Sequence, residues 1–170
     1  MGGHKVLGVV GWKNSGKTTL VEALLRELTG RGYRVSTIKH AHHAFDIDKP
    51  GKDSFRHRDA GAHEVLIASG ARWALLHELR DEKEPPLDEL LTHVAPCDIV
   101  IVEGFKTHAH PKIEVMRDRR PEGLIADREA DVLAIATTAP ELAGAHRTLP
   151  LNDAGVIADF ICETCGLMRT

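Results

Sequence analysis

Residues 11–18 read Gly-Trp-Lys-Asn-Ser-Gly-Lys-Thr, which matches the pattern Gly-x-x-x-x-Gly-Lys-[Ser/Thr] at every fixed position. An apolar run over residues 5–10 precedes this segment, and residues 18–31 follow it with apolar side chains at helical spacing. A strand, a loop and a helix in this order let backbone N–H groups and the helix N-terminus surround a phosphate. The segment is therefore predicted to be the phosphate-binding loop (P-loop) of a nucleotide-binding protein.

The chemistry of the P-loop assigns a role to most of its residues. The Lys17 ammonium is expected to reach the β- and γ-phosphates, and the Thr18 hydroxyl is placed to bind Mg²⁺. The absence of a side chain at Gly16 lets the backbone approach the phosphate closely. The predicted phosphate and nucleotide contacts are Gly11, Asn14, Ser15, Gly16, Lys17, Thr18 and Thr19.

The rest of the chain alternates strand-like and helical segments. We expect an α/β fold of the P-loop NTPase type, with a mostly parallel sheet flanked by helices, because strand, helix and strand follow one another within about 35 residues. Two short apolar runs split by Ser69-Gly70-Ala71 predict a β-hairpin excursion, and residues 118–131 are expected to be a solvated loop. The 170 residues fit a single domain. Strands are predicted at 34–38, 65–68, 73–76, 98–102, 112–116, 131–136 and 148–151, and helices at 53–60, 87–94 and 153–165.

Carboxylates after two predicted strands are candidates for the metal side of the site. Glu103 ends the strand at 98–102, at the carboxyl edge where ligands bind in open α/β sheets, so it is predicted to act with Thr18 on Mg²⁺ or to position a water. Asp98 begins that strand at the far end and is expected to be a turn residue. Asp48 lies in the loop after the second strand with Asp46, and it is either a catalytic, Mg²⁺-linked carboxylate or part of a solvated turn.

A histidine-rich segment begins where the second strand ends. Imidazole and ammonium groups suit a second anionic ligand or a partner, and imidazole also suits a transition metal. A plain surface loop is the remaining reading, and the residues alone leave all three open. The candidate second-ligand or partner residues are Lys39, His40, His42, His43, Lys52 and Arg56.

Recognition of the nucleotide base is less clearly encoded. The Asn-Lys-x-Asp string of many GTP-binding proteins is absent. Thr137 follows a late strand, and Asn152 and Asp153 follow the last one, so these three are base-side candidates, with a helix N-cap as the other reading of Asp153. These residues alone leave GTP and ATP both open.

Composition excludes several other classes. A net charge of −3 argues against a nucleic-acid-coating surface, and no apolar run reaches the roughly 18 residues of a membrane-spanning helix. Three scattered cysteines favour a reducing, cytoplasmic setting, with Cys162 and Cys165 on one turn of a terminal helix. No signal peptide is visible.

Several segments together resemble the MobB family, the molybdopterin-guanine dinucleotide biosynthesis adapter proteins. The P-loop is generic, whereas the string Asp-Ile-Asp-Lys-Pro-Gly-Lys-Asp-Ser at 46–54, after Lys-His-Ala-His-His at 39–43, is more specific. Arg-His-Arg at 56–58 and Val-Glu-Gly-Phe-Lys at 102–106 extend the match, which runs from about residue 5 to 106, with a looser fit over 131–161.

The resemblance implies a cytoplasmic GTP-binding protein that uses Mg²⁺, has at most weak GTPase activity and forms a homodimer. It implies assistance to a MobA-type guanylyltransferase that attaches GMP to molybdopterin, and a sheet topology similar to the dimeric SIMIBI class of P-loop proteins. Several members of that class carry a lysine directly after the first loop glycine, where this chain has Trp12. No catalytic glutamine or arginine of the P-loop type is visible in the sequence, so hydrolysis is expected to be slow.

Two other functions remain open from the residues. A small-molecule kinase would need an arginine-rich lid, and Arg117, Arg119, Arg120 and Arg128 offer one. A metallochaperone GTPase would account for the eleven histidines.

Overall fold

The computed structural model describes residues 3–41 and 47–167. The chain divides into two compact units, the first formed by Met1–His40 and Leu87–Thr170 and the second by Ala41–Pro86. The single-domain organisation stays a prediction. Among the described residues, no helix combines the length and the apolar character that crossing a bilayer requires.

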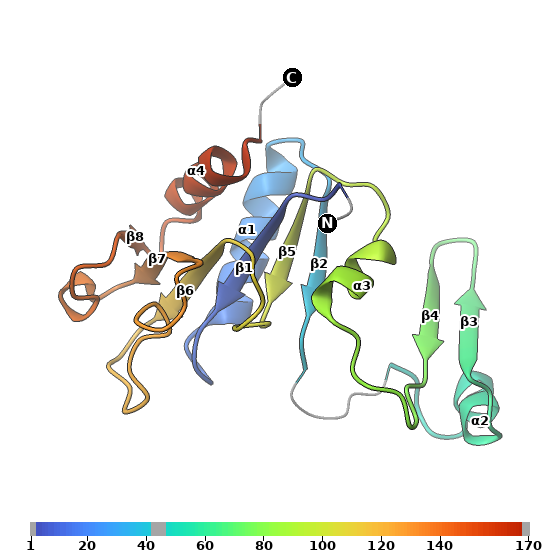
Figure 1. Ribbon diagram of the computed structural model, residues 1–170. Coiled ribbons are helices and arrows are strands. Elements are labelled where there is room, and N and C mark those ends of the chain that lie inside the picture. The colour runs from blue at the N-terminus through green and yellow to red at the C-terminus, as the bar shows by residue number, and fades with distance from the viewer. Residues whose placement is uncertain (1–2, 42–46, 168–170) are drawn as a thin grey trace. The chain divides into compact units, whose positions relative to one another are not determined.

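The first unit is built on a six-stranded sheet in the order β2-β5-β1-β6-β7-β8, in which every neighbouring pair is parallel (Figure 1). This confirms the predicted α/β fold of the P-loop NTPase type. Because all strands run the same way, the loops that follow them meet at one edge of the sheet. The strands are β1 (Val6–Val10), β2 (Val35–Lys39), β5 (Ile99–Glu103), β6 (Lys112–Met116), β7 (Val132–Thr137) and β8 (Thr148–Pro150).

One face of this sheet is covered by two helices, α1 (Lys17–Gly30) and α4 (Ala154–Cys165). The apolar stripe of α1, which includes Leu24 and Leu28, packs with alternate residues of the strands into the largest core cluster. The carboxylate of Asp153 accepts a hydrogen bond from the Val156 N–H at 3.0 Å, so the N-cap reading of this residue is confirmed. This packing holds the N-terminus of α1 directly behind the P-loop.

The other face is covered by α3 (Leu87–Thr92) and by loops. Residues 117–131 contain no helix or strand, as predicted, and Ile125 packs on Val10 and Val132. Both oxygens of the buried Glu114 carboxylate anchor this loop by accepting hydrogen bonds from the backbone N–H groups of residues 125 and 126, at 3.0 and 2.9 Å. A short 3₁₀ helix, η1 (Pro140–Leu142), was not expected from the sequence.

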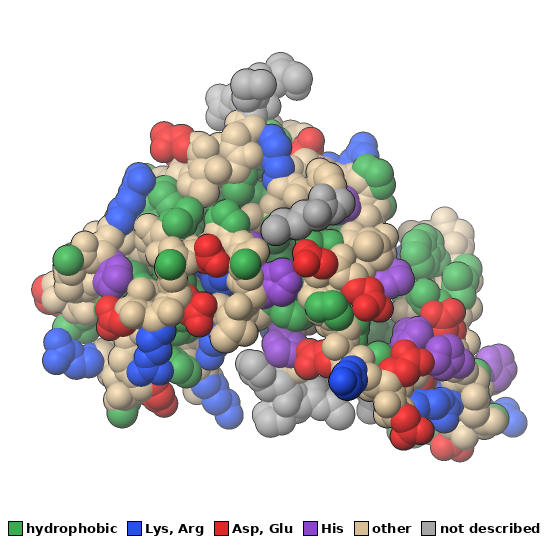
Figure 2. Space-filling model, in the orientation of Figure 1, with side chains coloured by type: hydrophobic (Ala, Val, Ile, Leu, Met, Phe, Trp, Pro, Cys, Tyr) green, Lys and Arg blue, Asp and Glu red, His purple; other side chains and the backbone are tan. Residues whose placement is uncertain are grey.

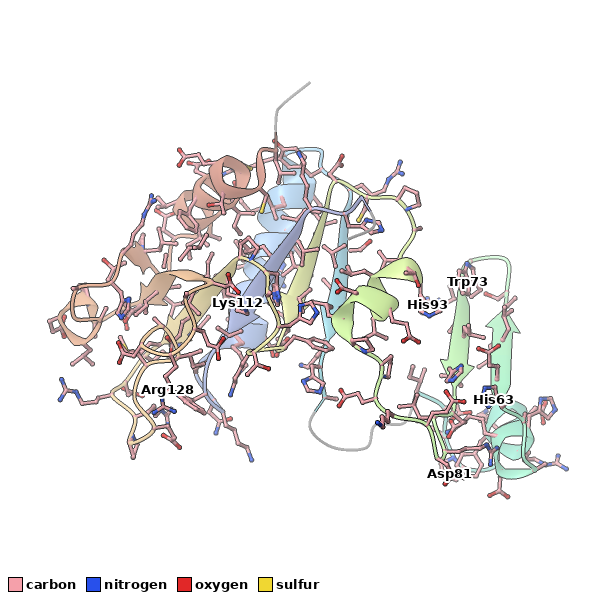
Figure 3. All side chains as sticks on the ribbon, viewed as in Figure 1. His63, Trp73, Asp81, His93, Lys112 and Arg128 are labelled. Atoms are coloured by element: carbon pink, nitrogen blue, oxygen red, sulfur yellow. The ribbon has the colours of Figure 1, made fainter. Side chains whose placement is uncertain are left out.

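A polar layer lies inside this second face, beside the middle of β1. The fully buried Lys112 ammonium donates to the carbonyls of His108 and His110, at 2.5 and 3.0 Å (Lys112 is labelled in Figure 3). The His110 ring is 6% exposed, and neither of its nitrogens has a hydrogen-bond partner among the described residues. A Cβ at Gly8 would lie 2.5 Å from His110 Nε2, so glycine is needed there to admit the ring. Burial, with the neighbouring Lys112 charge as the next cause, lowers the pKa of His110 to about 4.

The second unit holds α2 (Asp53–Asp59) and an antiparallel pair, β3 (Glu64–Ala68) and β4 (Trp73–His77). This pair is the predicted hairpin. Apolar side chains remain exposed on it, with Leu66 62% and Trp73 68% exposed, and Figure 2 shows hydrophobic side chains gathered over it. A two-stranded hairpin buries little surface of its own, so ion pairs between side chains carry much of its cohesion.

Candidate nucleotide-binding site

The P-loop follows β1 at the carboxyl edge of the parallel sheet and leads into α1. Three of its residues have positive φ, namely Gly11 at 156°, Asn14 at 62° and Gly16 at 98°. A Cβ at Gly11 would lie 2.5 Å from Ser15 Oγ and 2.7 Å from the Val115 carbonyl oxygen, so only glycine fits this position. The loop therefore has the tight turn and close backbone approach that its sequence pattern predicts.

The Lys17 ammonium folds back onto the loop. It donates hydrogen bonds to the carbonyl oxygens of Gly11 at 3.0 Å and Trp12 at 2.8 Å. Burial lowers the pKa of Lys17, while the Glu103 carboxylate acts in the opposite direction. Among the described residues, the acceptors of this partly desolvated ammonium are neutral carbonyls, so it would gain from an anion placed within its reach.

The Ser15 hydroxyl supplies an independent sign of a ligand. Ser15 is 4% exposed, and its Oγ has no hydrogen-bond partner in the part of the chain that the structure describes. A buried hydroxyl without a partner is costly, and a phosphate oxygen in the loop would satisfy it. This orphaned hydroxyl, Lys17 and the N-terminus of α1 together fit a phosphate group.

Thr18, Glu103 and Lys39 converge beside the P-loop from α1, β5 and β2. The Thr18 hydroxyl donates to Glu103 Oε1 at 2.9 Å, and Lys39 Nζ lies 3.4 Å from both that oxygen and the Thr18 hydroxyl oxygen. Glu103 is 9% exposed, so its carboxylate is held in a partly desolvated position. A hydroxyl and a carboxylate oxygen are ligands that suit Mg²⁺, and the residues fit that ion. The structure thus brings together two of the residues predicted for the metal side, with Lys39 from the predicted second-ligand loop.

Gly104 and Phe105 shape the adjoining end of β2. The backbone N–H of His40 donates to the Glu103 carbonyl at 2.9 Å, and the His40 ring stacks on Phe105 with centroids 4.7 Å apart. Gly104 has φ of 106°, and a Cβ there would lie 2.8 Å from the His40 Cβ. The glycine is therefore required for the close approach of His40.

Contacts of Trp12 in the P-loop, and of Arg117 and Lys106 beside it, were not found from the sequence. Arg117 Nε donates to the Ser15 carbonyl at 3.3 Å. The Trp12 indole N–H donates to the Gly123 carbonyl at 2.8 Å, and Lys106 Nζ lies 4.2 Å from the centroid of its ring. Trp12 therefore ties the 117–131 loop to the P-loop, which explains an aromatic residue at this variable position. The only sequence signal for Arg117 was the arginine-rich composition of its segment.

A cavity of about 550 Å³ adjoins the P-loop on the side of β6. Trp12 and Ser15 line it together with Arg117, Arg119 and Arg120. A second cavity, of about 420 Å³, lies at the ends of β7 and β8 and is lined by Thr137 and Asn152 among others. Both volumes are within the range of small-molecule sites. Thr137 and Asn152, predicted to lie on the base side, therefore line a cavity. Their contact with a nucleotide base stays a prediction.

Other predicted residues have structural roles. Asp98 Oδ2 accepts from the Arg34 backbone N–H at 2.6 Å, as expected of a turn residue. Thr137 is buried, and its hydroxyl accepts from the Ala139 N–H at 3.0 Å. Asn14 and Thr19 are exposed on the P-loop and the first turn of α1. The ligand contacts predicted for Asn14, Thr19 and Asp153 remain predictions.

The remaining predicted residues lie in the second unit or outside the described residues. Asp48 is paired with the Arg58 guanidinium at 2.5 Å, and this hydrogen bond lowers the pKa of Asp48. Its catalytic role stays a prediction, whereas the solvated-turn reading is wrong for a side chain that is 6% exposed. Lys52 and Arg56 are exposed at the beginning and on the surface of α2. His42, His43 and Asp46 lie outside the described residues.

Comparison with known proteins gives a consistent result. The profile of the family described as "Molybdopterin guanine dinucleotide synthesis protein B" (MobB) matches residues 6–138. The molybdopterin-guanine dinucleotide biosynthesis adapter protein of Escherichia coli is 42% identical over 93% of this chain and 91% of its own. That of Haemophilus influenzae is 42% identical over 92% and 86%. The crystal structure of a MobB homologue from Bacillus stearothermophilus superposes with a TM-score of 0.72 at 27% identity, covering 96% of this chain and 99% of the other.

Proposed function

Since the chain belongs to the molybdopterin guanine dinucleotide synthesis protein B family, we propose that it binds Mg²⁺-GTP at the P-loop and acts as an adapter for a MobA-type guanylyltransferase. In this role it serves molybdenum cofactor biosynthesis in the cytoplasm. The observation that carries the proposal is the buried, unpartnered Ser15 hydroxyl inside a P-loop whose next turn presents Thr18 to Glu103.

Mg²⁺ would be held by Thr18 and Glu103 and would neutralise charge on the β- and γ-phosphates. Lys17 exchanges its two carbonyl acceptors for phosphate oxygens, and Ser15 gains the partner it lacks. Lys39 Nζ lies 3.4 Å from Glu103 Oε1 and helps to orient that carboxylate. Each of these groups already lies at the P-loop, so little reorganisation is needed on binding.

Hydrolysis by this site is proposed to be slow. The sequence contains no glutamine, so the chain lacks the residue that orients the attacking water in many GTPases. Arg117, from the 117–131 loop, contacts the P-loop. Its Nε donates a hydrogen bond to the Ser15 carbonyl, so this nitrogen is already engaged by the loop backbone. Binding with slow turnover suits an adapter whose nucleotide signals a state to a partner.

The partners proposed are a second copy of the chain and the guanylyltransferase with its molybdopterin. Leu66, Trp73 and Leu75 are exposed on one face of the hairpin and favour a protein contact over a free surface, because large apolar side chains gathered together are uncommon on an isolated protein. This apolar surface supports the homodimer proposal.

The test is reconstituted formation of molybdopterin guanine dinucleotide by a MobA-type enzyme with GTP, with and without this protein. Addition of the protein should increase product formation, and Lys17→Ala should remove the increase. Arg26→Ala is the matched control, since its side chain is 78% exposed on the same helix and it should behave as wild type.

Equal product yields with wild type and Lys17→Ala would contradict the proposal. Nucleotide turnover that rises strongly only when a small-molecule acceptor is added would favour a kinase instead, with the cavity beside Arg117, Arg119 and Arg120 as the acceptor site.

A further inference from the structure

A group of metal-ligating side chains meets at the open end of the hairpin, within the second unit. His63 precedes β3, His77 ends β4, and Glu82 follows in the next turn. One ligand atom of each lies within 4.8 Å of the others. Figure 2 shows histidine and acidic side chains side by side in this part of the molecule, and Figure 3 labels His63.

The backbone of the hairpin sets this convergence. Glu64 pairs with His77 in the antiparallel register, and the Glu78 N–H donates to the His63 carbonyl at 3.0 Å, so His63 lies one residue beyond the partner of His77, at the end of the ladder. There the two imidazole rings meet edge to face, with their centroids 4.6 Å apart. Arg80 has φ of 47°, and the Glu82 N–H bonds to the Leu79 carbonyl, which turns the chain back and brings Glu82 over both rings.

Each histidine nitrogen lies close to one oxygen of the Glu82 carboxylate. His77 Nε2 lies 3.3 Å from Glu82 Oε2, and His63 Nε2 lies 3.5 Å from Glu82 Oε1. Tetrahedral zinc with bonds of about 2.0–2.1 Å needs ligand atoms about 3.4 Å apart. The two distances go to different oxygens of Glu82, and one ligand atom from each of the three residues lies within 4.8 Å of the others, so side-chain rotations would have to draw them together around an ion.

Glu64 supplies the outer contact that metal-binding histidines use. Its Oε1 lies 2.8 Å from His77 Nδ1. The Glu64 and Glu82 carboxylates raise the pKa of His77, and a metal ion would take the place of the proton on Nε2 while Glu64 keeps its hydrogen bond to Nδ1. Glu64 itself lies outside the His63–His77–Glu82 group, and its contact is of the kind that orients metal-binding histidines.

We propose that His63, His77 and Glu82 bind a divalent transition metal of the zinc class, with Glu64 as a positioning residue. Two imidazoles and one carboxylate favour zinc over Mg²⁺ or Ca²⁺, which prefer oxygen ligands alone. All three ligands are exposed, so the ion exchanges with solvent and keeps an open coordination position. The ion ties the ends of β3 and β4 to the following turn, which stiffens a hairpin with little core. The site is independent of the proposed nucleotide function.

The experiment is a calorimetric titration of the metal-free full-length protein with Zn²⁺, and with Co²⁺ followed by its visible absorption. Wild type should bind one ion at the site with tetrahedral-type Co²⁺ absorption. His63→Ala, His77→Ala and Glu82→Ala should each weaken this binding roughly tenfold or more, since each removes a ligand. His93→Ala, an exposed histidine of the first unit, is the matched control and should leave it unchanged (Figure 3).

Glu64 is tested as a positioning residue by two variants. Glu64→Ala should weaken Zn²⁺ binding about tenfold without changing the number of ions bound, and Glu64→Gln, which keeps an acceptor oxygen, should restore part of the affinity. Circular dichroism of every variant checks that the fold is kept. The proposal is overturned if wild type binds no Zn²⁺, or if the His63→Ala/His77→Ala double variant binds Zn²⁺ and Co²⁺ as wild type does.

Discussion

The P-loop edge of the first unit and the hairpin of the second unit are held in shape by different means. At the P-loop, backbone conformation and a closed core decide the geometry, as the positive φ of Gly16 and the fully buried Val9 and Val10 show. In the second unit, Val65 is the buried apolar residue among the described ones, and the ion pairs of Arg58 with Asp48 and Glu78 supply the cohesion.

The difference separates two kinds of functional surface. A site made by backbone N–H groups on a packed sheet is preorganised for one ligand shape, so its chemistry can be read from a short motif. A surface made by side chains on a thin hairpin depends on partners, ions or charge pairs for its order. The two surfaces should therefore respond to different perturbations.

Gly11→Ala should have the largest effect on the first unit. The new Cβ would meet the Val115 carbonyl oxygen and the Ser15 hydroxyl, so we expect a loss of about 3 kcal/mol in the free energy of unfolding, together with loss of nucleotide binding. Chemical denaturation measures the first. Gly30→Ala, where a Cβ meets open space at the end of α1, should change stability by less than about 1 kcal/mol. Equal stabilities for the two variants would contradict the packing account.

Arg58→Ala should loosen the second unit selectively. It removes the ion pairs of Arg58 with Asp48 and Glu78, so the Asp48 carboxylate loses this guanidinium. Hydrogen exchange should become roughly tenfold faster, or more, in the backbone of α2 and β3, since a buried carboxylate that loses its partner costs at least that factor in local stability. Exchange in β1 and β5 should not change. Acceleration spread evenly over both units would show that they are stabilised together.

His110 should give the first unit a smaller, pH-dependent weakness. Its folded pKa of about 4 lies below the usual value, so between about pH 6.5 and 4 the unfolded chain binds a proton that the folded chain does not. This group therefore lowers stability as the pH falls through that window, by about 2 kcal/mol at pH 4.5 relative to neutral pH. His110→Leu should reduce the pH dependence of the free energy of unfolding, measured by urea denaturation, by about that amount. An unchanged slope in the variant would assign the weakness to other groups.

The sequence predicted the first unit well because its signals are local. The P-loop pattern, the apolar strands and the position of Glu103 after a buried strand depend on spacing along the chain, and the structure brings Thr18 and Glu103 within 2.9 Å. The hairpin was found from its two apolar runs and the Ser69–Ala71 break. Strand ends differed by a residue or two, as hydrogen bonding at the ends depends on neighbours.

The contacts that were missed join segments far apart in sequence. Trp12 bonds to Gly123 and Arg117 to Ser15, and no spacing rule relates such positions. The pairing of Asp48 with Arg58 could not be read from a loop whose conformation was unknown. The cluster of His63, His77 and Glu82 needs the strand register, which composition does not give.

Calorimetric titration with GTP, with and without Mg²⁺, measures directly whether the P-loop edge is the preorganised Mg²⁺-GTP site proposed for it. Wild type should bind one GTP per chain, more tightly with Mg²⁺, and Glu103→Gln should lose most of the Mg²⁺ effect. Lys17→Ala should weaken binding about 100-fold or more, since it removes charge-assisted hydrogen bonds in a desolvated site. GTP binding by Lys17→Ala with wild-type affinity, or no GTP binding by wild type, would contradict the account.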